Sequence, residues 1–153
     1  MPTSEETTAD QLTSSQCWDY IRRAKLGRLA VIVDGQPEIF PINFAADRGT
    51  VVFRTAAGTK LSAALSGNRV AFQIDGYDDN LSSAWSVVLK GGASLLTDNE
   101  ELLASEGLAL FPWQAGTKNA FVRIEPDVTS GRRFLISNEA RRHVLRGMGL
   151  YTE

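Results

Sequence analysis

The chain reads PEIFPINFAADRGTVVFRTAAGTK from Pro37 to Lys60, and this stretch carries the clearest secondary-structure pattern of the sequence. Two runs rich in β-branched and aromatic residues, Glu38–Phe44 and Thr50–Thr55, are separated by the turn-forming Asp47-Arg48-Gly49. Residues of these types favour strands, and a short Asp- and Gly-containing interval between two such runs is typical of a hairpin. The stretch therefore predicts two antiparallel strands joined by a tight turn.

Four side chains near the end of this hairpin suit an anion. Arg54, Thr55, Thr59 and Lys60 combine two cations with two hydroxyls, which offer charge-assisted hydrogen bonds in several directions. Gly58 permits a close backbone approach just before a predicted helix start. The group fits a phosphate monoester, although solvated charges at a strand end and a helix start would give the same spacing.

Upstream of the hairpin, a helical pattern is followed by an extended one. Thr13 and Gln16 have the spacing of a capping box, and apolar residues then recur at helical intervals. We expect a helix over residues 14–25 that stops at Gly27. A strand at Leu29–Val33 follows, and with the hairpin it predicts a three-stranded antiparallel meander.

Downstream of the hairpin, short strands alternate with turns and a few helices. The expected helices are Thr59–Leu65, Glu100–Leu110 and a basic Asn138–Leu145; the expected strands are Arg69–Asp75, Trp85–Leu96, Ala120–Pro126 and Arg132–Ile136, with a loop at Gly76–Ser83. Parallel pairing would require a helical crossover after nearly every strand, so this order favours antiparallel pairing. The sequence predicts a mainly β protein folded as an antiparallel barrel.

Length and charge limit the organisation and the partners of the chain. With 153 residues and 43% hydrophobic composition, we expect one domain over residues 11–153 after a disordered tail at residues 1–10. The formal net charge of −2 gives no overall field that would attract nucleic acid or an anionic membrane. An anion site on this chain must therefore be local.

Cysteine usage and hydropathy indicate a reducing compartment. Cys17 is the only cysteine, which excludes an intrachain disulfide and a multi-cysteine zinc site. The first residues are polar and acidic rather than signal-like, and no stretch approaches the ~20 apolar residues of a membrane span. We expect a cytoplasmic protein without a membrane partner and without a metal.

Four motifs in order resemble a known family. They are Pro41-Ile42-Asn43-Phe44, Val52-Phe53-Arg54-Thr55, Gly58-Thr59-Lys60-Leu61, and Trp85 to Gly91, and their order and spacing extend over residues 14–136. Together they resemble the pyridoxamine 5′-phosphate oxidase-like split-barrel flavoproteins, and look closest to the short, nitroimidazole-reductase-like branch. The resemblance implies an FMN-binding split barrel that assembles as a homodimer with the flavin at the interface.

The resemblance also assigns roles to individual residues. It implies that Arg54, Thr55 and Lys60 hold the FMN phosphate, beside the Thr59 of the same cluster. It also implies that Pro41, Ile42, Asn43 and Phe44 line the isoalloxazine ring and that Trp85 and Ser86 come from the second subunit. A flavin needs apolar walls, a few polar partners and cations for its phosphate, and these residue types supply them. Ordinary core packing remains the alternative for the apolar members of this set.

Three functions are compatible with these residues. The first is an FMN-dependent oxidoreductase that acts on a small conjugated substrate, for which the sequence identifies no catalytic side chain. The second is a deazaflavin-dependent reductase, whose longer acidic cofactor would need a groove formed by Arg69, Arg123, Arg132 and Arg133, although Arg132-Arg133 is equally read as a surface pair near Asp127. The third is a flavin-binding module without turnover.

Two further groups have a functional and a simpler interpretation. Arg141 and His143 imitate the spacing of a C-terminal substrate-binding pair in the family's namesake oxidase, but their surroundings also suit a solvated basic helix, and the chain lacks that enzyme's closing segment. Asp75, Asp78 and Asp79 imitate a cation site, but a polar turn explains them equally.

Overall fold

The computed structural model describes residues 9–55, 58–80, 82–96 and 120–149. The elements in this part of the chain are β1 Ala9–Gln11, α1 Ser14–Arg23, β2 Leu26–Val33, β3 Gln36–Asn43, β4 Ala45–Asp47, β5 Thr50–Thr55, α2 Thr59–Ala64, β6 Val70–Tyr77, β7 Ser83–Leu95, β8 Ala120–Leu135 and α4 Asn138–Gly147. The predicted helix at Glu100–Leu110 lies outside the described residues.

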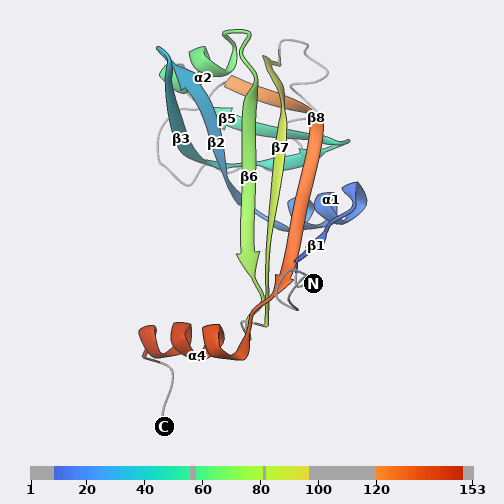
Figure 1. Cartoon of the computed structure of the whole chain (residues 1–153). Coiled ribbons are helices and arrows are strands. Elements are labelled where there is room, and N and C mark those ends of the chain that lie inside the picture. Colours follow the sequence, from blue (N-terminus) through green and yellow to red (C-terminus); the bar gives the residue numbers. More distant parts are fainter. Residues whose placement is uncertain (1–8, 56–57, 81, 97–119, 150–153) are drawn as a thin grey trace, which may run out of the picture.

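All of these strands belong to one antiparallel sheet. Its order is β3-β2-β6-β7-β8-β5-β4, and β1 pairs with β8 beside this path. The sheet curls into a half-barrel, and β6, β7 and β8 extend beyond it toward α4 (Figure 1). The prediction of a mainly antiparallel β fold of the split-barrel type is confirmed.

The chain passes from one edge of the sheet to the other at a single residue. β3 is one edge strand and β4 is the other, and only Phe44 separates them in sequence. Phe44 is buried, and its backbone N–H donates to the Lys25 carbonyl at 3.3 Å. The predicted three-stranded meander is therefore wrong, because β5 pairs with β4 and β8 rather than with β3. Local turn signals predicted the hairpins, but strand order depends on non-local pairing.

The first helix follows its capping signals. Thr13 accepts a hydrogen bond from the Gln16 backbone and Gln16 reciprocates, so the predicted capping box is present. The helix ends at Arg23, before Gly27, which does not act as a stop. Gly27 lies in β2, where an added Cβ would come within 2.5 Å of the Phe72 ring. This glycine is required for close packing of β2 on β6 rather than for chain reversal.

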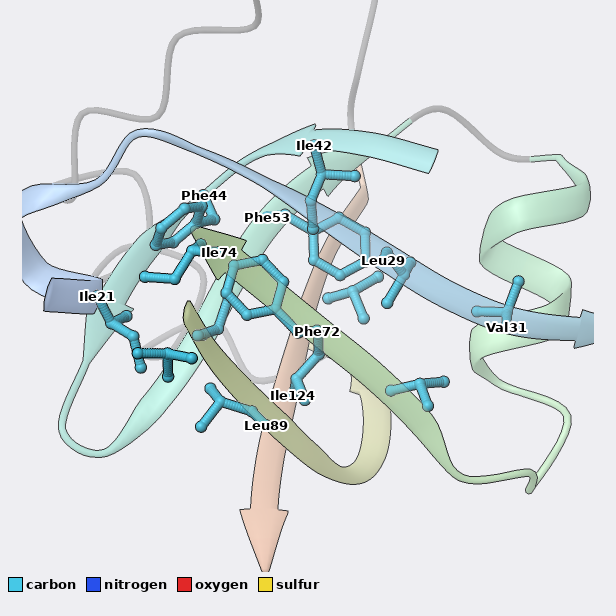
Figure 2. Packing of buried hydrophobic residues seen from close by; sticks show 14 of the residues in the cluster. Ile21, Leu29, Val31, Ile42, Phe44, Phe53, Phe72, Ile74, Leu89 and Ile124 are labelled. Atoms are coloured by element: carbon cyan, nitrogen blue, oxygen red, sulfur yellow. The ribbon is translucent and has the colours of Figure 1, made fainter. Parts of the chain in front are cut away.

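The inner face of the curled sheet forms the core. Side chains from β2, β3, β5, β6, β7 and β8 meet there with Ile21 from α1 (Figure 2). The largest fully buried side chains are Phe53 and Phe72, and the Phe44 ring meets the Phe72 ring edge-to-face at 4.8 Å between centroids. Cys17 is also fully buried, and burial raises the pKa of its thiol. Burial of these apolar surfaces is the main stabilising contribution to the barrel.

A register shift divides the long β7–β8 ladder. Lys90 lies opposite Val128 and Gly91 lies opposite Pro126, so Asp127 is an extra residue on β8. Such a bulge reverses which residues of the strand point inward. Before the bulge in sequence, Val122 and Ile124 face the core side; after it, Thr129 and Gly131 do. Ala120–Pro126 and Arg132–Ile136 are thus one continuous strand, not two as predicted. At Asp127 the alternation of inward and outward residues along β8 reverses, and in the sequence this looks like a break between two strands.

The remaining differences from the sequence expectations are at element ends. Gly76 and Tyr77 continue β6, and Ser83 begins β7, so the expected loop shortens to a turn around Asp78. Ala9 and Asp10 pair with β8, which corrects their assignment to a disordered tail; backbone hydrogen bonds to a long strand order them. The basic helix predicted at Asn138–Leu145 is present as α4, and none of its residues is buried.

The bulge generates the first prediction. An added Cβ at Gly91 would lie 2.1 Å from the Glu125 carbonyl oxygen, whereas the neighbouring Gly92 has nothing within 4 Å. Gly91→Ala should lower the free energy of unfolding by about 2–3 kcal/mol, because backbone must move to relieve the contact. Gly92→Ala should stay within about 0.5 kcal/mol of the parent protein. Urea denaturation measures both, and equal stability of the two variants would contradict this account.

Candidate functional site

The sheet has an inner face that packs in the core and an outer face that points away from it. In antiparallel pairs, directly opposite residues share a face. The outer face therefore includes a row formed by Asp75, Ser86, Arg132 and Gln11 across β6, β7, β8 and β1. A second row joins Pro41, Arg28, Gln73, Val88 and Ser130. The predicted site residues divide between the two faces.

The predicted ring-lining residues of β3 alternate between the faces. Ile42 and Phe44 are buried members of the core, so ordinary packing accounts for their side chains. Pro41 is exposed and Asn43 is half-buried, and both lie on the outer face opposite Arg28 and Leu26. A ligand on the outer face of β3 would therefore meet Pro41 and Asn43, and not the two larger side chains.

The predicted phosphate-binding residues lie at the end of β5 and the start of α2. The half-buried Arg54 guanidinium is 5.2 Å from the centroid of the Phe121 ring, on the outer face. Thr55 is only 4% exposed and points inward. Thr59 and Lys60 begin α2, but the structure does not describe their side chains. Of the predicted cluster, Arg54 is thus the described side chain that lies on the outer face.

Trp85 and Ser86 are neighbours that point in opposite directions. Trp85 lies on the inner face, where its ring stacks on the Tyr20 ring at 4.2 Å between centroids, and the Arg23 guanidinium covers the far side of Tyr20 at 5.0 Å. An added Cβ at Gly76 would come within 2.7 Å of the Trp85 indole. This column attaches α1 to the sheet, so Trp85 is a packing residue here. Ser86 is half-buried on the outer face.

Arg54 and Ser86 are far apart within one chain. Arg54 lies opposite Phe121 and Ser86 opposite Arg132, at the two ends of β8 (Figure 1). At ~3.3 Å per residue, the two β8 positions are separated by about 35 Å along the strand. One small ligand does not bridge this distance on a single chain.

The four arginines expected in a shared basic groove are dispersed. Arg69 forms two hydrogen bonds with Asp127, at 2.6 and 2.5 Å. Arg123 donates to Asp47 at 2.9 Å with both side chains largely buried, and Arg133 on the inner face donates to the Tyr20 hydroxyl at 3.4 Å. Asp127 thus pairs with Arg69 and not with Arg132-Arg133. The expected groove is not formed, and Arg132 alone faces outward without a carboxylate partner among the described residues.

The acidic residues and the histidine of the sequence also have structural explanations. Asp75 accepts from Arg28 at 3.0 Å, and Asp78 accepts from the Ser83 backbone at 2.8 Å and from the Ser82 hydroxyl, which lowers the pKa of the Asp78 carboxyl. Within the described residues no group of three or more metal-ligating side chains occurs. His143 is exposed on α4, as is Arg141.

Two features of the outer face escaped the sequence analysis. One is an open hollow of about 350 Å³ beside β1, lined by Ser86, Ser130 and Arg132 among others. Thr129 to Gly131 lay outside the expected strands, so no sign of the hollow was visible in the sequence. The other is the apolar character of the outer face of β2 and β3, where Ile39, Leu26 and Ile32 are 67%, 45% and 43% exposed. Leu26–Val33 is apolar at almost every position, a pattern typical of strands buried on both faces.

Comparisons with known proteins agree with the observed fold. A family model described as Pyridoxamine 5'-phosphate oxidase matches residues 13–133. The FAD binding protein from Mycobacterium smegmatis is 40% identical, with a TM-score of 0.73 over 84% of this chain and 100% of that chain. A putative pyridoxamine 5'-phosphate oxidase from Corynebacterium glutamicum is 31% identical, with a TM-score of 0.75 over 90% and 98%. An uncharacterized Mycobacterium tuberculosis protein is 40% identical over 93 residues, which are 61% of this chain and 83% of that protein.

The dispersal of the arginines generates the second prediction. The Arg69 guanidinium lowers the pKa of the Asp127 carboxyl, chiefly through side-chain hydrogen bonds. The pair therefore stabilises the fold above the ordinary carboxyl pKa of about 4, and this stabilisation is lost as the pH falls through the lower folded value. In Arg69→Ala the Asp127 pKa should rise toward its ordinary value in a carbon-13 NMR titration. An unchanged titration would show that Arg69 does not hold this carboxylate in solution.

Proposed function

Because the chain belongs to the pyridoxamine 5′-phosphate oxidase family, we propose that it binds a flavin on its outer face and acts as a flavin-dependent oxidoreductase on a small conjugated substrate. The 40% identical Mycobacterium smegmatis protein is described as FAD binding, which supports a flavin as the ligand. The observation that carries the proposal for this chain is the position of Arg54 on the outer face at the end of β5. An FMN unit, free or as part of FAD, is the expected group at that position.

The described residues near Arg54 fit a flavin phosphate. Arg54 is half-buried against Phe121, so its guanidinium is held in place before a ligand arrives. An arginine fork binds phosphate oxygens in two directions. An added Cβ at Gly58 would have no described atom within 4 Å. Phe121, Val52 and Leu96 form a second apolar cluster on the same side of the sheet, which would exclude water from one flank of the phosphate site.

The partner that completes this site is a second copy of the chain. Leu26, Ala30, Ile32, Ile39, Pro41, Ala71 and Val88 make the outer face of β3, β2, β6 and β7 unusually apolar for a surface. Exposed apolar patches of this kind mark association sites. Arg54 and Ser86, which are far apart on one chain, would approach one ligand if each came from a different protomer. A homodimer with the flavin between the protomers accounts for both observations.

The protein's own residues would then bind, orient and enclose the flavin. Arg54 holds the phosphate end, and Pro41 and Asn43 present an apolar edge and an amide to the ring from β3. The bound flavin supplies hydride or electron transfer, which requires no acid or base from the chain. The second protomer would exclude water from the site.

The absorption spectrum of the purified protein tests this function most directly. A bound flavin should give the two visible bands of a flavoprotein, and mass determination of the released molecule identifies it. Bleaching by a nicotinamide donor, followed by recovery with a quinone or nitroaromatic acceptor, would support an oxidoreductase. A bound flavin that no donor reduces would instead favour a flavin-binding module without turnover, and a protein that binds no flavin would refute the proposal.

The phosphate site generates the third prediction. Arg54→Ala should weaken FMN binding by about 1–3 kcal/mol, because charge-assisted hydrogen bonds are lost. Fluorescence titration with FMN measures the change. Arg142→Ala, an exposed arginine on α4, is the control and should leave the affinity unchanged. Equal FMN affinity of the Arg54 variant and the parent protein would remove Arg54 from the site.

The dimer generates the fourth prediction. Ile39→Glu places a charge in the proposed interface and should convert the dimer to monomer, with weaker flavin binding, because a buried unpaired charge is costly. Sedimentation equilibrium gives the mass. The control is Leu65→Glu, which adds the same charge at an exposed apolar residue after α2. Loss of the dimer in both variants, or in neither, would argue against this interface.

A further inference from the structure

The hollow beside β1 collects several polar side chains around one cation. Gln11 and Ser86 both lie opposite Arg132 in the sheet, on its outer face. Ser130 on the same face also lines the hollow, whose volume is about 350 Å³. Hydroxyls, an amide and a guanidinium thus surround one space. These groups together donate hydrogen bonds toward an oxygen-rich anion.

Arg132 differs from Arg28, Arg69 and Arg123 because it has no carboxylate partner among the described residues. Among the described residues, Arg28 pairs with Asp75, Arg69 with Asp127, and Arg123 with Asp47. Arg132 makes no ion pair or side-chain hydrogen bond within that part of the chain, and neither do Ser86 and Ser130. Asp75 is on the same row but two strands away, about 10 Å, and is occupied by Arg28. The Arg132 guanidinium therefore lines the hollow without a carboxylate partner among the described residues.

Two exposed aromatic rings lie in the next row of the same face. Phe134 follows Arg132 by two residues on β8, about 7 Å along the strand, and is 40% exposed. Tyr77 is 61% exposed and faces Phe134 across the small Ala84. Large exposed rings beside a cation are the usual means of stacking a nucleobase.

We infer that this surface is a second subsite, which binds the adenosine monophosphate group of a dinucleotide. Arg132, Ser86 and Ser130 bind the phosphate oxygens, and Phe134 and Tyr77 contact the adenine. FAD carries this group beyond its FMN portion, so the inference in its flavin form rests on the proposed function and names FAD as the preferred cofactor. A nicotinamide dinucleotide carries the same group and is the other source of the same chemistry.

Binding measurements on three variants test the subsite. FMN, FAD, NADPH and ADP are titrated by calorimetry into the full chain and into Arg132→Ala, Phe134→Ala and Arg133→Ala, each checked for folding by circular dichroism. The parent protein should bind FAD more tightly than FMN. Arg132→Ala should raise the Kd for FAD and for ADP by about 10- to 100-fold, and Phe134→Ala by about fivefold or more, with the Kd for FMN unchanged. Arg133→Ala, on the opposite face, should leave all Kd values unchanged.

The outcomes separate the subsite from the proposed function. FMN and FAD binding of equal strength, or an equal loss of both in Arg132→Ala, overturns the subsite and leaves flavin binding intact. FAD affinity that neither Arg132→Ala nor Phe134→Ala changes also overturns it. If the parent protein binds no flavin, but binds NADPH or ADP through Arg132, the subsite stands and the proposed function falls. A protein that binds none of the four ligands refutes both.

Discussion

The close approach of β7 and β8 at Gly91 is the constraint on which both faces of the sheet depend. No side chain fits there, because the Glu125 carbonyl oxygen occupies the space of a Cβ. The extra residue Asp127 on β8 reverses the alternation, so that Ile124 enters the core above the bulge while Arg132 points outward below it. Without this shift, Ile124 and Arg132 would point to the same face of the sheet, so either the apolar residue would be exposed or the arginine would enter the core.

The sequence predicted the elements better than their arrangement. The capping box of α1 and the turns of the two early hairpins are local signals, and the structure has both. Strand order is not local: β2 pairs with β6, about forty residues later, and Phe44 moves the chain to the opposite edge. Gly27 was predicted to stop the first helix, but it serves close packing of strands, as Gly91 does inside its strand, and this is visible only once the neighbouring strand is known.

The candidate site shows the same limit. A resemblance in sequence identifies candidate binding residues. The alternation of side chains along each strand then determines which of them lie on the outer face, where a ligand would bind. Alternation alone separates Ile42 and Phe44 from Pro41 and Asn43, and the core-packed Trp85 from Ser86. Arg132 was one of the four arginines of the expected groove, and it stands out only when the carboxylate partners of Arg69 and Arg123 and the inward direction of Arg133 are known. Which charged residues pair across the sheet depends on the register between strands, and this register cannot be predicted from one segment of the sequence.

The burial of Cys17 has a practical consequence. The only thiol of the chain is enclosed between α1 and β8, where an added Cβ at Gly131 would come within 2.8 Å of its sulfur. Alkylating reagents attack an exposed thiolate. Cys17 lies on the buried side of α1, so the sheet blocks access to its sulfur, and its raised pKa disfavours the thiolate. Its rate of alkylation therefore reports how often α1 detaches from the sheet, and the wild-type chain carries this reporter of local opening without any engineered label.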